Sequence, residues 1–345
     1  MSSSNKDHIE NPPRQPSPAP WPEGIASSSA HSGREPIVLV AGADDKYAIG
    51  LTVALSSALS HLDPDRHAFV YVLDGGLSSE SRTKCHASLS AANKGARITF
   101  VNGDLSKFSR LNDQGYSRAS FLRLLIPDVV SDEFGRVLYL DSDVVVLGDV
   151  SELWALPDEG WTFWAATDDG IDGARHSRDP VVYSGVPLDS PIFNSGVMLI
   201  ELPRWRETAI SERALQLLSA HSNCCITPDQ DALNAIAWSE WGKLSSEWNC
   251  QVRGKRVLSK IDTGEDGPKI IHYLDAKPWD GRVACAYQDA FDTALFSSGW
   301  FTLASEMWYR ARQATNRTKR RLRPQNLMRA AQRRIRWLAE RLRLN

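Results

Sequence analysis

Short apolar runs alternate with helical segments through the first 140 residues, and this alternation limits the possible folds more than any other feature. The apolar runs, each predicted to be a β-strand, are residues 37–40, 69–73, 97–101 and 137–140. Between them, residues 49–62, 78–92 and 121–130 are predicted to be helical, the last despite Pro127. The strands are apolar throughout rather than at alternate positions, which indicates a mostly parallel sheet with helices on both faces. We therefore predict an α/β fold.

The second half of the chain continues this pattern. Strands are predicted at 161–166, 193–202 and 270–273, and helices at 206–221 and 229–238. In open α/β sheets ligands bind beyond the carboxyl ends of the strands, so polar residues directly after each strand are candidate site residues. The sequence has no G-x-G-x-x-G and no Walker loop, which disfavours dinucleotide and P-loop nucleotide sites.

Composition divides the chain into three regions. Residues 1–35 are rich in Ser and Pro and poor in large apolar side chains, so they are predicted to be disordered. Residues 36–300 are predicted to form the folded domain, and 301–345 a basic helical tail. The five cysteines form no C-x-x-C pair, which favours a reducing compartment over a disulfide framework. Neither a signal peptide nor a membrane span is predicted.

Two carboxylates follow the strand at 137–140. Burying Asp141 and Asp143 together without a partner is costly, so a cation is expected beside them. Oxygen ligands suit Mg²⁺ or Mn²⁺, and a third ligand could come from His272, an imidazole that Mn²⁺ accepts more readily. The alternatives are a turn with two solvated acids and a partly buried histidine with a satisfied hydrogen bond.

Other polar clusters also lie at element ends. Asp44 and Tyr47, after the first strand, could bind and stack on a nucleotide base, or could simply form an Asx-type turn. Lys277 follows the last strand and could contact phosphate. The segments 194–196 and 229–231 carry amides and carboxylates that suit sugar hydroxyls, although Asp229 could instead cap a helix.

Six motifs, in this order, resemble glycosyltransferase family eight, and among its members the bacterial lipopolysaccharide α-galactosyltransferases and glucosyltransferases. They are Ala43-Asp44-Asp45-x-Tyr47-Ala48, Phe121-x-Arg123-Leu124, Val137-Leu138-Tyr139-Leu140-Asp141-x-Asp143, Phe193-Asn194-Ser195-Gly196-Val197, Asp229-Gln230-Asp231-x-Leu233-Asn234, and His272-Tyr273 through Lys277-Pro278-Trp279. The chain departs from the family pattern at Lys46, where a small polar residue is usual. It also lacks the usual glycine between His272 and Lys277.

The resemblance implies a catalytic domain of the GT-A fold over 36–300, a UDP-hexose donor (galactose or glucose), a saccharide or glycolipid acceptor, Mn²⁺ (or Mg²⁺), and retention of anomeric configuration. It assigns the metal to Asp141, Asp143 and His272. It assigns the nucleotide and donor sugar to Ala43, Asp44, Lys46, Tyr47, Arg123, Asp141, Ser142, Asn194, Ser195 and Lys277. It implies catalytic roles for Asp168, Asp229 and Gln230.

The C-terminus is strongly basic. Residues 310–345 contain thirteen Lys and Arg but one acid, Glu340, so they carry +12 in a chain of net charge −2 and leave the rest at −14. After Pro324, apolar residues recur at helical spacing: Leu327, Ala331, Ile335, Leu338 and Leu342. This pattern predicts an amphipathic helix on an anionic membrane, and hence a cytoplasmic enzyme peripheral to the inner face of the cell membrane. A solvated helix and a helix packed on the acidic body are the alternatives; no nucleic-acid motif accompanies the charge.

Two rival functions share parts of this pattern. A haloacid-dehalogenase-like phosphatase also carries D-x-D after an apolar strand, but on the first strand of the domain, whereas Asp141 comes about a hundred residues later. The other rival is a non-catalytic protein that binds a UDP-sugar. Release of UDP with and without acceptor would distinguish transferase, hydrolase and binder.

Overall fold

The computed structural model describes residues 35–63, 65–109, 111, 117–170, 182–221, 225, 227–260, 267–281 and 283–321. The predicted disordered segment, apart from Glu35, and the amphipathic stretch after Pro324 lie outside these residues. The boundaries predicted for the three regions therefore stay predictions.

A seven-stranded sheet forms the centre of the molecule, with strand order β3-β2-β1-β4-β7-β6-β8. Its strands are β1 (Ile37–Ala43), β2 (Ala68–Asp74), β3 (Ala96–Asn102), β4 (Arg136–Leu140), β6 (Phe163–Thr167), β7 (Phe193–Glu201) and β8 (Trp241–Lys243). The pairs β3–β2, β2–β1, β1–β4 and β6–β8 are parallel, whereas β7 runs antiparallel to β4 and β6. The predicted mostly parallel sheet is confirmed.

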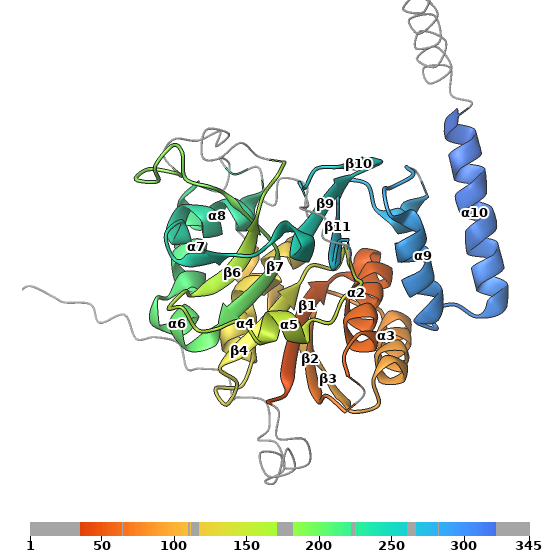
Figure 1. Ribbon diagram of the computed structural model, residues 1–345, viewed down its shortest axis with the longest axis horizontal. Helices are drawn as coiled ribbons and strands as arrows, with labels where there is room; N and C mark the ends of the chain where they lie inside the picture. Colours follow the sequence, from red (N-terminus) through yellow and green to blue (C-terminus); the bar gives the residue numbers. More distant parts are fainter. Residues whose placement is uncertain are drawn as a thin grey trace, which may run out of the picture.

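Helices cover both faces of this sheet (Figure 1). One side carries α2 (Ala48–Ser60) and α3 (Ser79–Ala92); the other carries α4 (Ile126–Val129), α6 (Leu202–Glu207), α7 (Ile210–His221) and α8 (Pro228–Ala237). Eleven of the thirteen residues of α2 are buried. It is apolar almost all round because it also packs against α9 (Gln288–Ser297) on its outer side.

A second, four-stranded sheet has the order β10-β9-β11-β5. It comprises β5 (Val144–Val146), β9 (Cys250–Arg253), β10 (Arg256–Val257) and β11 (Ile270–Leu274). The strand predicted at 270–273 lies here, antiparallel to β5, and not in the central sheet. His272 was expected at the end of that strand but pairs with Val144 in its middle.

Two predicted helices have a different form. Residues 121–130 form a 3₁₀ helix, η4 (Arg118–Leu125), followed by α4, because Pro127 can occupy only the first turn of an α-helix. The helix predicted at 206–221 is split into α6 and α7, and Ala209, between them, has a left-handed backbone (φ 51°). The remaining short helices are η2 (Asp45–Tyr47), η3 (Leu105–Phe108), α5 (Ser151–Trp154), η6 (Ser246–Asn249) and η7 (Pro278–Asp280).

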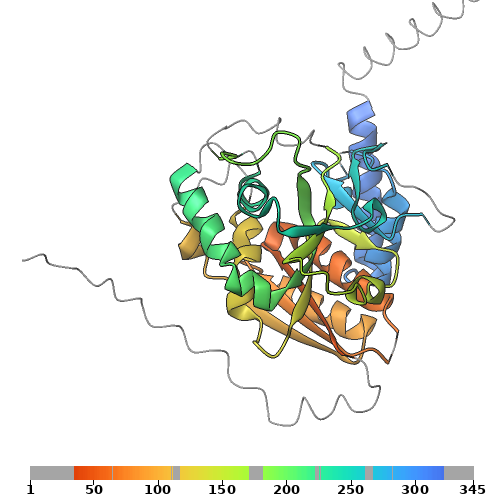
Figure 2. The same ribbon diagram turned by 60° about the vertical axis from the view of Figure 1, so that its left-hand side comes forward.

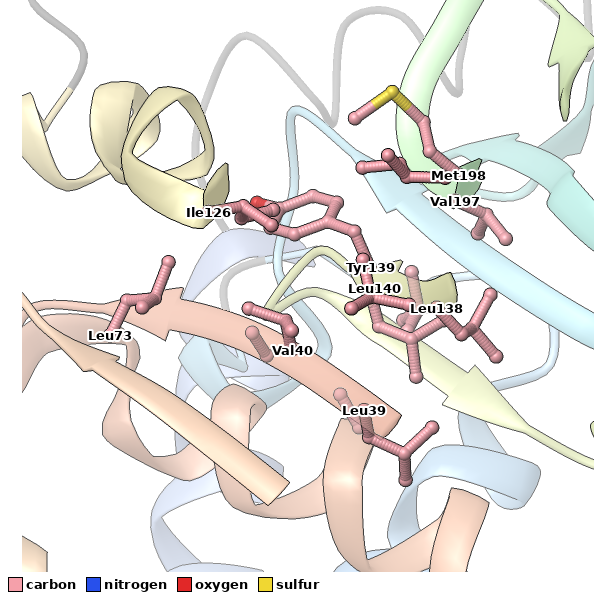
Figure 3. Close-up of a cluster of buried hydrophobic side chains, with 14 of the residues drawn as sticks. Leu39, Val40, Leu73, Ile126, Leu138, Tyr139, Leu140, Val197 and Met198 are labelled. Carbon is pink, nitrogen blue, oxygen red and sulfur yellow. The ribbon is translucent and has the colours of Figure 1, made fainter. Parts of the chain in front are cut away.

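The apolar runs of the central strands build the core (Figure 3). Leu39 of β1, Leu138 of β4 and Val197 of β7 come from neighbouring strands, and Ile126 of α4 lies near them. All four are at most 1% exposed. Burial of each such side chain contributes about 1.5–3 kcal/mol to folding. This packing fixes the ends of β1, β4 and β7, from which the polar residues of the site project.

The last described helix, α10 (Leu303–Arg321), lies beside α9 in both views of the chain (Figures 1 and 2). Its Tyr309 is buried and its ring lies 5.0 Å from that of Phe301. No helix among the described residues is both long enough and apolar enough to span a membrane.

Candidate active site

The site lies where the direction of the sheet connections changes. From β1 the chain passes to β2 on one side, while β4, the other neighbour of β1, is reached later. Asp44 follows β1 and Asp141 follows β4, so both lie at the carboxyl ends of adjacent parallel strands. Ligands of open α/β sheets bind at such a switch point.

The segment Asp141–Asp143 forms the corner between the two sheets. The Asp141 backbone N–H donates to the Gly196 carbonyl oxygen of β7 at 2.7 Å, and the Asp143 carbonyl oxygen accepts from Tyr273 N of β11 at 3.0 Å. Ser142, between the two aspartates, packs against α2, where a side chain on Gly50 would overlap the Ser142 carbonyl oxygen. The backbone that carries both carboxylates is therefore held by β7, β11 and α2.

His272 joins the two carboxylates. Its Nε2 lies 3.1 Å from Asp143 Oδ1 and 3.8 Å from Asp141 Oδ2, and candidate ligand atoms of the three residues lie within 4.8 Å of one another. The three residues predicted as metal ligands are thus brought together.

A chain of hydrogen bonds fixes which nitrogen of His272 carries its proton. Gly196 N donates to Asn194 Oδ1 at 3.0 Å, and the same oxygen accepts from Asn249 Nδ2 at 2.9 Å. Asn249 then presents its own Oδ1 to His272 Nδ1 at 3.0 Å. An amide oxygen can only accept, so the network assigns the proton to Nδ1 and leaves a free lone pair on Nε2.

Asp143 has one oxygen with a partner and one without. Oδ2 accepts from Lys277 Nζ at 2.5 Å, whereas Oδ1 is buried and has no hydrogen-bond partner among the described residues. Burial favours the neutral acid, but Lys277, together with His272, outweighs burial and holds the pKa of Asp143 well below its usual range. A buried carboxylate oxygen beside the lone pair of His272 Nε2 is costly without a cation. The residues present therefore fit a divalent metal ion.

Arg123 occupies the other side of Asp141. This guanidinium, 5% exposed, donates from Nη2 to Asp141 Oδ1 at 2.7 Å and pairs through Nε with Asp229 Oδ2 at 3.0 Å. Tyr139 Oη donates to the same Asp141 oxygen at 2.7 Å. Burial would lower the pKa of Arg123, but the carboxylate of Asp141, with others nearby, raises it. With Oδ1 engaged in this way, Asp141 has Oδ2 available for a cation.

Asp229 does not cap its helix. It lies in the first turn of α8, but its carboxylate pairs with Arg123, and the Thr227 N–H is accepted by Asp231 Oδ2 at 3.0 Å. Burial raises the pKa of Asp229, against the opposing effect of Arg123. Asp229 is therefore not the N-cap residue of α8, which is Thr227, and its carboxylate is engaged by Arg123 instead.

The predicted sugar-binding residues form one buried network. Gln230 Nε2 donates to Asp168 Oδ2 at 3.0 Å, and Asn194 Nδ2 donates to the same oxygen at 3.2 Å. Gln230 Oε1 accepts from Ser195 N at 3.1 Å, and Arg123 Nη1 donates to Ser195 Oγ at 2.6 Å. These side chains, far apart in sequence, therefore meet beside the metal ligands.

The segment after β1 has the geometry of a turn. Asp44 Oδ1 accepts from Tyr47 N at 3.2 Å and Oδ2 accepts from Ser117 Oγ at 2.6 Å, while the Ala43 carbonyl oxygen accepts from Gly75 N. The half-buried Tyr47 ring meets Trp279 edge-on at 5.6 Å, and Lys46 is exposed. The Asx-type turn is thus present, and base binding by these residues stays a prediction.

The sequence did not point to Asn249, and it gave Gly196 only as part of a motif, without a role. A Cβ on Gly196 would lie 2.7 Å from His272 Nδ1 and 2.9 Å from Asp141 Oδ2, so this position must be glycine. Asn249 is fully buried, and no pattern in the sequence around it marks it as a site residue.

The missing glycine between His272 and Lys277 is explained by Asp275. This residue adopts a left-handed backbone (φ 56°), and its carboxylate pairs with Arg253 Nε at 3.0 Å. Aspartate tolerates this conformation better than most residues with a side chain. The loop thus makes a glycine-like turn without glycine, and Lys277 still reaches Asp143.

Comparisons with known proteins agree with these observations. The sequence model of Glycosyl transferase family 8 matches residues 38–282. General stress protein A of Bacillus subtilis (strain 168) is 28% identical over 77% of this chain and 96% of that protein. Lipopolysaccharide 1,2-glucosyltransferase of Escherichia coli (strain K12) is 29% identical over 75% of this chain and 77% of that protein. Lipopolysaccharide 1,3-galactosyltransferase of Salmonella typhimurium (strain LT2) is 25% identical over 78% of this chain and 81% of that protein.

Solved structures show the same fold. The galactosyltransferase LgtC, solved with donor and acceptor sugar analogues, matches with a TM-score of 0.64 and 24% identity over 78% of this chain and 98% of its own. The bifunctional glycosyltransferase WbbM matches with a TM-score of 0.64 and 22% identity over 81% of this chain and 52% of its own. These likenesses confirm the predicted GT-A fold.

The family model covers all six motifs and leaves no place for the phosphatase alternative, in which the D-x-D would follow the first strand. Members of such a family take a nucleotide-sugar donor and a saccharide acceptor. The chain belongs to glycosyl transferase family 8 and is a hexosyltransferase.

Proposed function

We propose that this enzyme transfers galactose or glucose from a UDP-sugar to a saccharide or glycolipid acceptor, with Mn²⁺ held by Asp141, Asp143 and His272 and with retention of configuration. The observation that carries the proposal is the buried, unpartnered Asp143 Oδ1 beside the free lone pair of His272 Nε2, 3.1 Å away. The names of two relatives, lipopolysaccharide glucosyl- and galactosyltransferases, support synthesis of lipopolysaccharide or another cell-surface glycan.

Mn²⁺ is proposed over Mg²⁺ because one of the three ligands is an imidazole nitrogen. When bound, a divalent ion neutralises charge on the departing diphosphate.

Lys277 supplies a further positive charge at the same place. Burial would lower its pKa, but the Asp143 carboxylate outweighs burial and raises it, so the ammonium stays charged at neutral pH. Its Nζ lies 2.5 Å from Asp143 and 5.9 Å from the Tyr47 ring. These contacts support the proposal that Lys277 holds the diphosphate, between the metal ligands and a uridine bound by Ala43, Asp44, Lys46 and Tyr47.

The network around Arg123 is proposed to bind the hexose. Arg123 neutralises Asp141 and Asp229 and orients Ser195, while Asp168 and Asn194 hold the neighbouring amides in place. Gln230 has its amide orientation fixed by Ser195 N–H, which donates to Oε1. Gln230 or Asp229 then offers the polar oxygen that faces the reacting sugar carbon.

A screen of nucleotide-sugars for Mn²⁺-dependent UDP release tests this proposal. Release from UDP-galactose or UDP-glucose that rises at least tenfold with a saccharide acceptor identifies a transferase. Asp143→Asn should lower that release by two orders of magnitude or more, because the metal loses a charged oxygen ligand. UDP binding without turnover would instead identify a non-catalytic binder, and full activity in chelator would refute the metal assignment.

We also propose that the basic C-terminus places the enzyme on the anionic inner face of the cell membrane. The supporting observations are the +12 charge of residues 310–345 and three exposed apolar residues on α10, namely Leu303, Met307 and Trp308. Each cation near an anionic surface contributes up to about 1 kcal/mol before screening. Attachment should therefore be strong at low salt and weaken as salt rises.

Vesicle sedimentation tests the membrane proposal. Full-length protein should bind phosphatidylglycerol vesicles but not phosphatidylcholine vesicles, and a chain that ends at residue 321 should bind several-fold more weakly. Equal binding of the two chains would indicate that the segment after 321 packs on the acidic body instead.

A further inference from the structure

Helix α10 reaches the segment that carries Lys277. Gln313 of α10 is 7% exposed, and its Nε2 donates to the Pro278 carbonyl oxygen at 2.9 Å. Pro278 directly follows Lys277 and begins η7. Gln313 lies beyond residues 38–282, which the family model matches. The side chain of Gln313, outside the region that the family model matches, therefore binds the backbone of Pro278, next to Lys277.

The Pro278 carbonyl oxygen receives a second amide. Gln288 of α9 is 8% exposed, and its Nε2 donates to this oxygen at 3.2 Å. Gln313 Nε2 is itself oriented by Tyr309 Oη, 2.6 Å away and also buried. Two neighbouring helices thus fix one carbonyl group through buried hydrogen bonds, which are expensive to leave unmade.

The segment and α10 approach each other closely. Gly281 ends η7 with a left-handed backbone (φ 65°), and a side chain there would overlap Gln313 Oε1 and lie 2.8 Å from Gln313 Cδ. Only glycine suits both the backbone angle and this contact. The interface leaves little room for the segment to shift while α10 is in place.

The other side of the same segment faces the donor site. Lys277 Nζ donates to Asp143 Oδ2 and, at 2.7 Å, to the Tyr273 carbonyl oxygen. The Trp279 ring lies 5.6 Å from the Tyr47 ring. Residues 277–281 are therefore held between the proposed diphosphate and uridine contacts on one side and α9 and α10 on the other.

We propose that Gln313 is a positioning residue of the donor site, which sets the place of Lys277 by holding the Pro278 carbonyl group. The proposal rests on the proposed function, in which Lys277 contacts the diphosphate of the donor. If Gln313 has this role, α10 contributes to the donor site, although α10 lies outside residues 38–282, which the family model matches. It also gives a reason to keep residue 313 in any chain shortened to test the basic tail.

Gln313→Met tests the proposal in the full-length chain, because methionine keeps the shape and removes the donor. Binding of UDP and of uridine, both with Mn²⁺, is measured by calorimetry. UDP affinity should fall about fivefold, the effect of one lost hydrogen bond, while uridine affinity stays within twofold. Thr315→Ala is the matched control, since its exposed hydroxyl bonds to Ala311 O of the same helix, and it should change neither affinity.

A double-mutant cycle with Lys277→Met separates positioning from general loosening. If Gln313 acts through Lys277, the UDP affinity of the double variant should equal that of Lys277→Met within twofold. Independent, additive losses, or an unchanged ratio of UDP to uridine affinity in Gln313→Met, would overturn the proposal. If Gln313→Met does not melt cooperatively, Gln288→Met removes the other amide from the same carbonyl group and should give the same selective loss.

Failure of the proposed function would look different. Lys277→Met would then leave UDP affinity unchanged. A loss in Lys277→Met without one in Gln313→Met would refute only the role of Gln313.

Discussion

At the scale of single residues, the neutral side chain of Asn249 determines what His272 can bind. Its Oδ1 accepts a hydrogen bond from the His272 Nδ1–H and so leaves Nε2 unprotonated toward the carboxylates. Outer partners of this kind commonly contribute 10- to 100-fold to metal affinity.

Asn249→Leu should therefore weaken Mn²⁺ binding by about 10- to 100-fold, because His272 loses the acceptor that fixes its tautomer. Asn249→Asp keeps an acceptor oxygen and should lose less. Mn²⁺ affinity measured by electron paramagnetic resonance gives the comparison directly. Equal losses in both variants would show that packing at this fully buried position, and not the tautomer, is what matters.

Asp275 carries the backbone strain of the loop before Lys277. Its ion pair with Arg253 is about half exposed, so the pair contributes less than about 1 kcal/mol. Asp275→Asn should leave the melting temperature within a degree or two, because asparagine also tolerates a left-handed backbone. Asp275→Val should cost about 1–3 kcal/mol, since a β-branched residue is strongly disfavoured there. Thermal unfolding of the two variants is the measurement, and similar melting temperatures would argue against strain.

At the scale of elements, α2 packs against the backbone of Ser142, between the two aspartates of the proposed metal site. A side chain on Gly50 would overlap the Ser142 carbonyl oxygen and lie 2.6 Å from the Trp279 ring. In an exposed helix, alanine would be favoured over glycine by up to about 1 kcal/mol.

Gly50→Ala should instead destabilise the protein by about 1–3 kcal/mol through overpacking and weaken Mn²⁺ binding, because Ser142 lies between the two aspartates. Gly135→Ala is the control, since a Cβ there meets nothing within 4 Å. Denaturant unfolding and metal titration of both variants would decide. A Gly50→Ala variant as stable as Gly135→Ala would show that the corner can move.

Of the central sheet the sequence predicted every strand but β8, whereas of the second sheet it predicted only β11. Strands β1, β2 and β4 each contain a continuous apolar run of four or more residues, a signal that needs no knowledge of partners. Strands β5 and β10 have three and two residues, too short for any periodicity. β5 pairs with the distant strand β11, and β10 forms a hairpin with β9, which directly precedes it. The metal ligands were predicted from the type of their side chains and from their positions at the ends of predicted strands. Asn249 was not, because its role depends on His272 and Asn194, which are remote in sequence.

At the scale of the whole molecule, the ligands of the proposed metal come from both sheets. Asp141 is tied to β7 of the central sheet, whereas His272 belongs to β11 of the second. An ion that binds the native chain alone stabilises it by about 2.7 kcal/mol at one hundred times its dissociation constant. Saturating Mn²⁺ should thus raise the melting temperature by several degrees, and Asp143→Asn should abolish the rise. A similar rise in this variant would place the ion elsewhere.

The corner at Asp141–Asp143 also has a consequence for the order of folding. His272 enters the chain more than a hundred residues after Asp143, and the hydrogen bond from Tyr273 N to Asp143 O can form only when β11 has found β5. Contacts of such long sequence separation close large loops and are slow to form. During refolding, secondary structure and burial of the core should therefore recover first, and the capacity to bind Mn²⁺ should return last, as a signal that both sheets have docked.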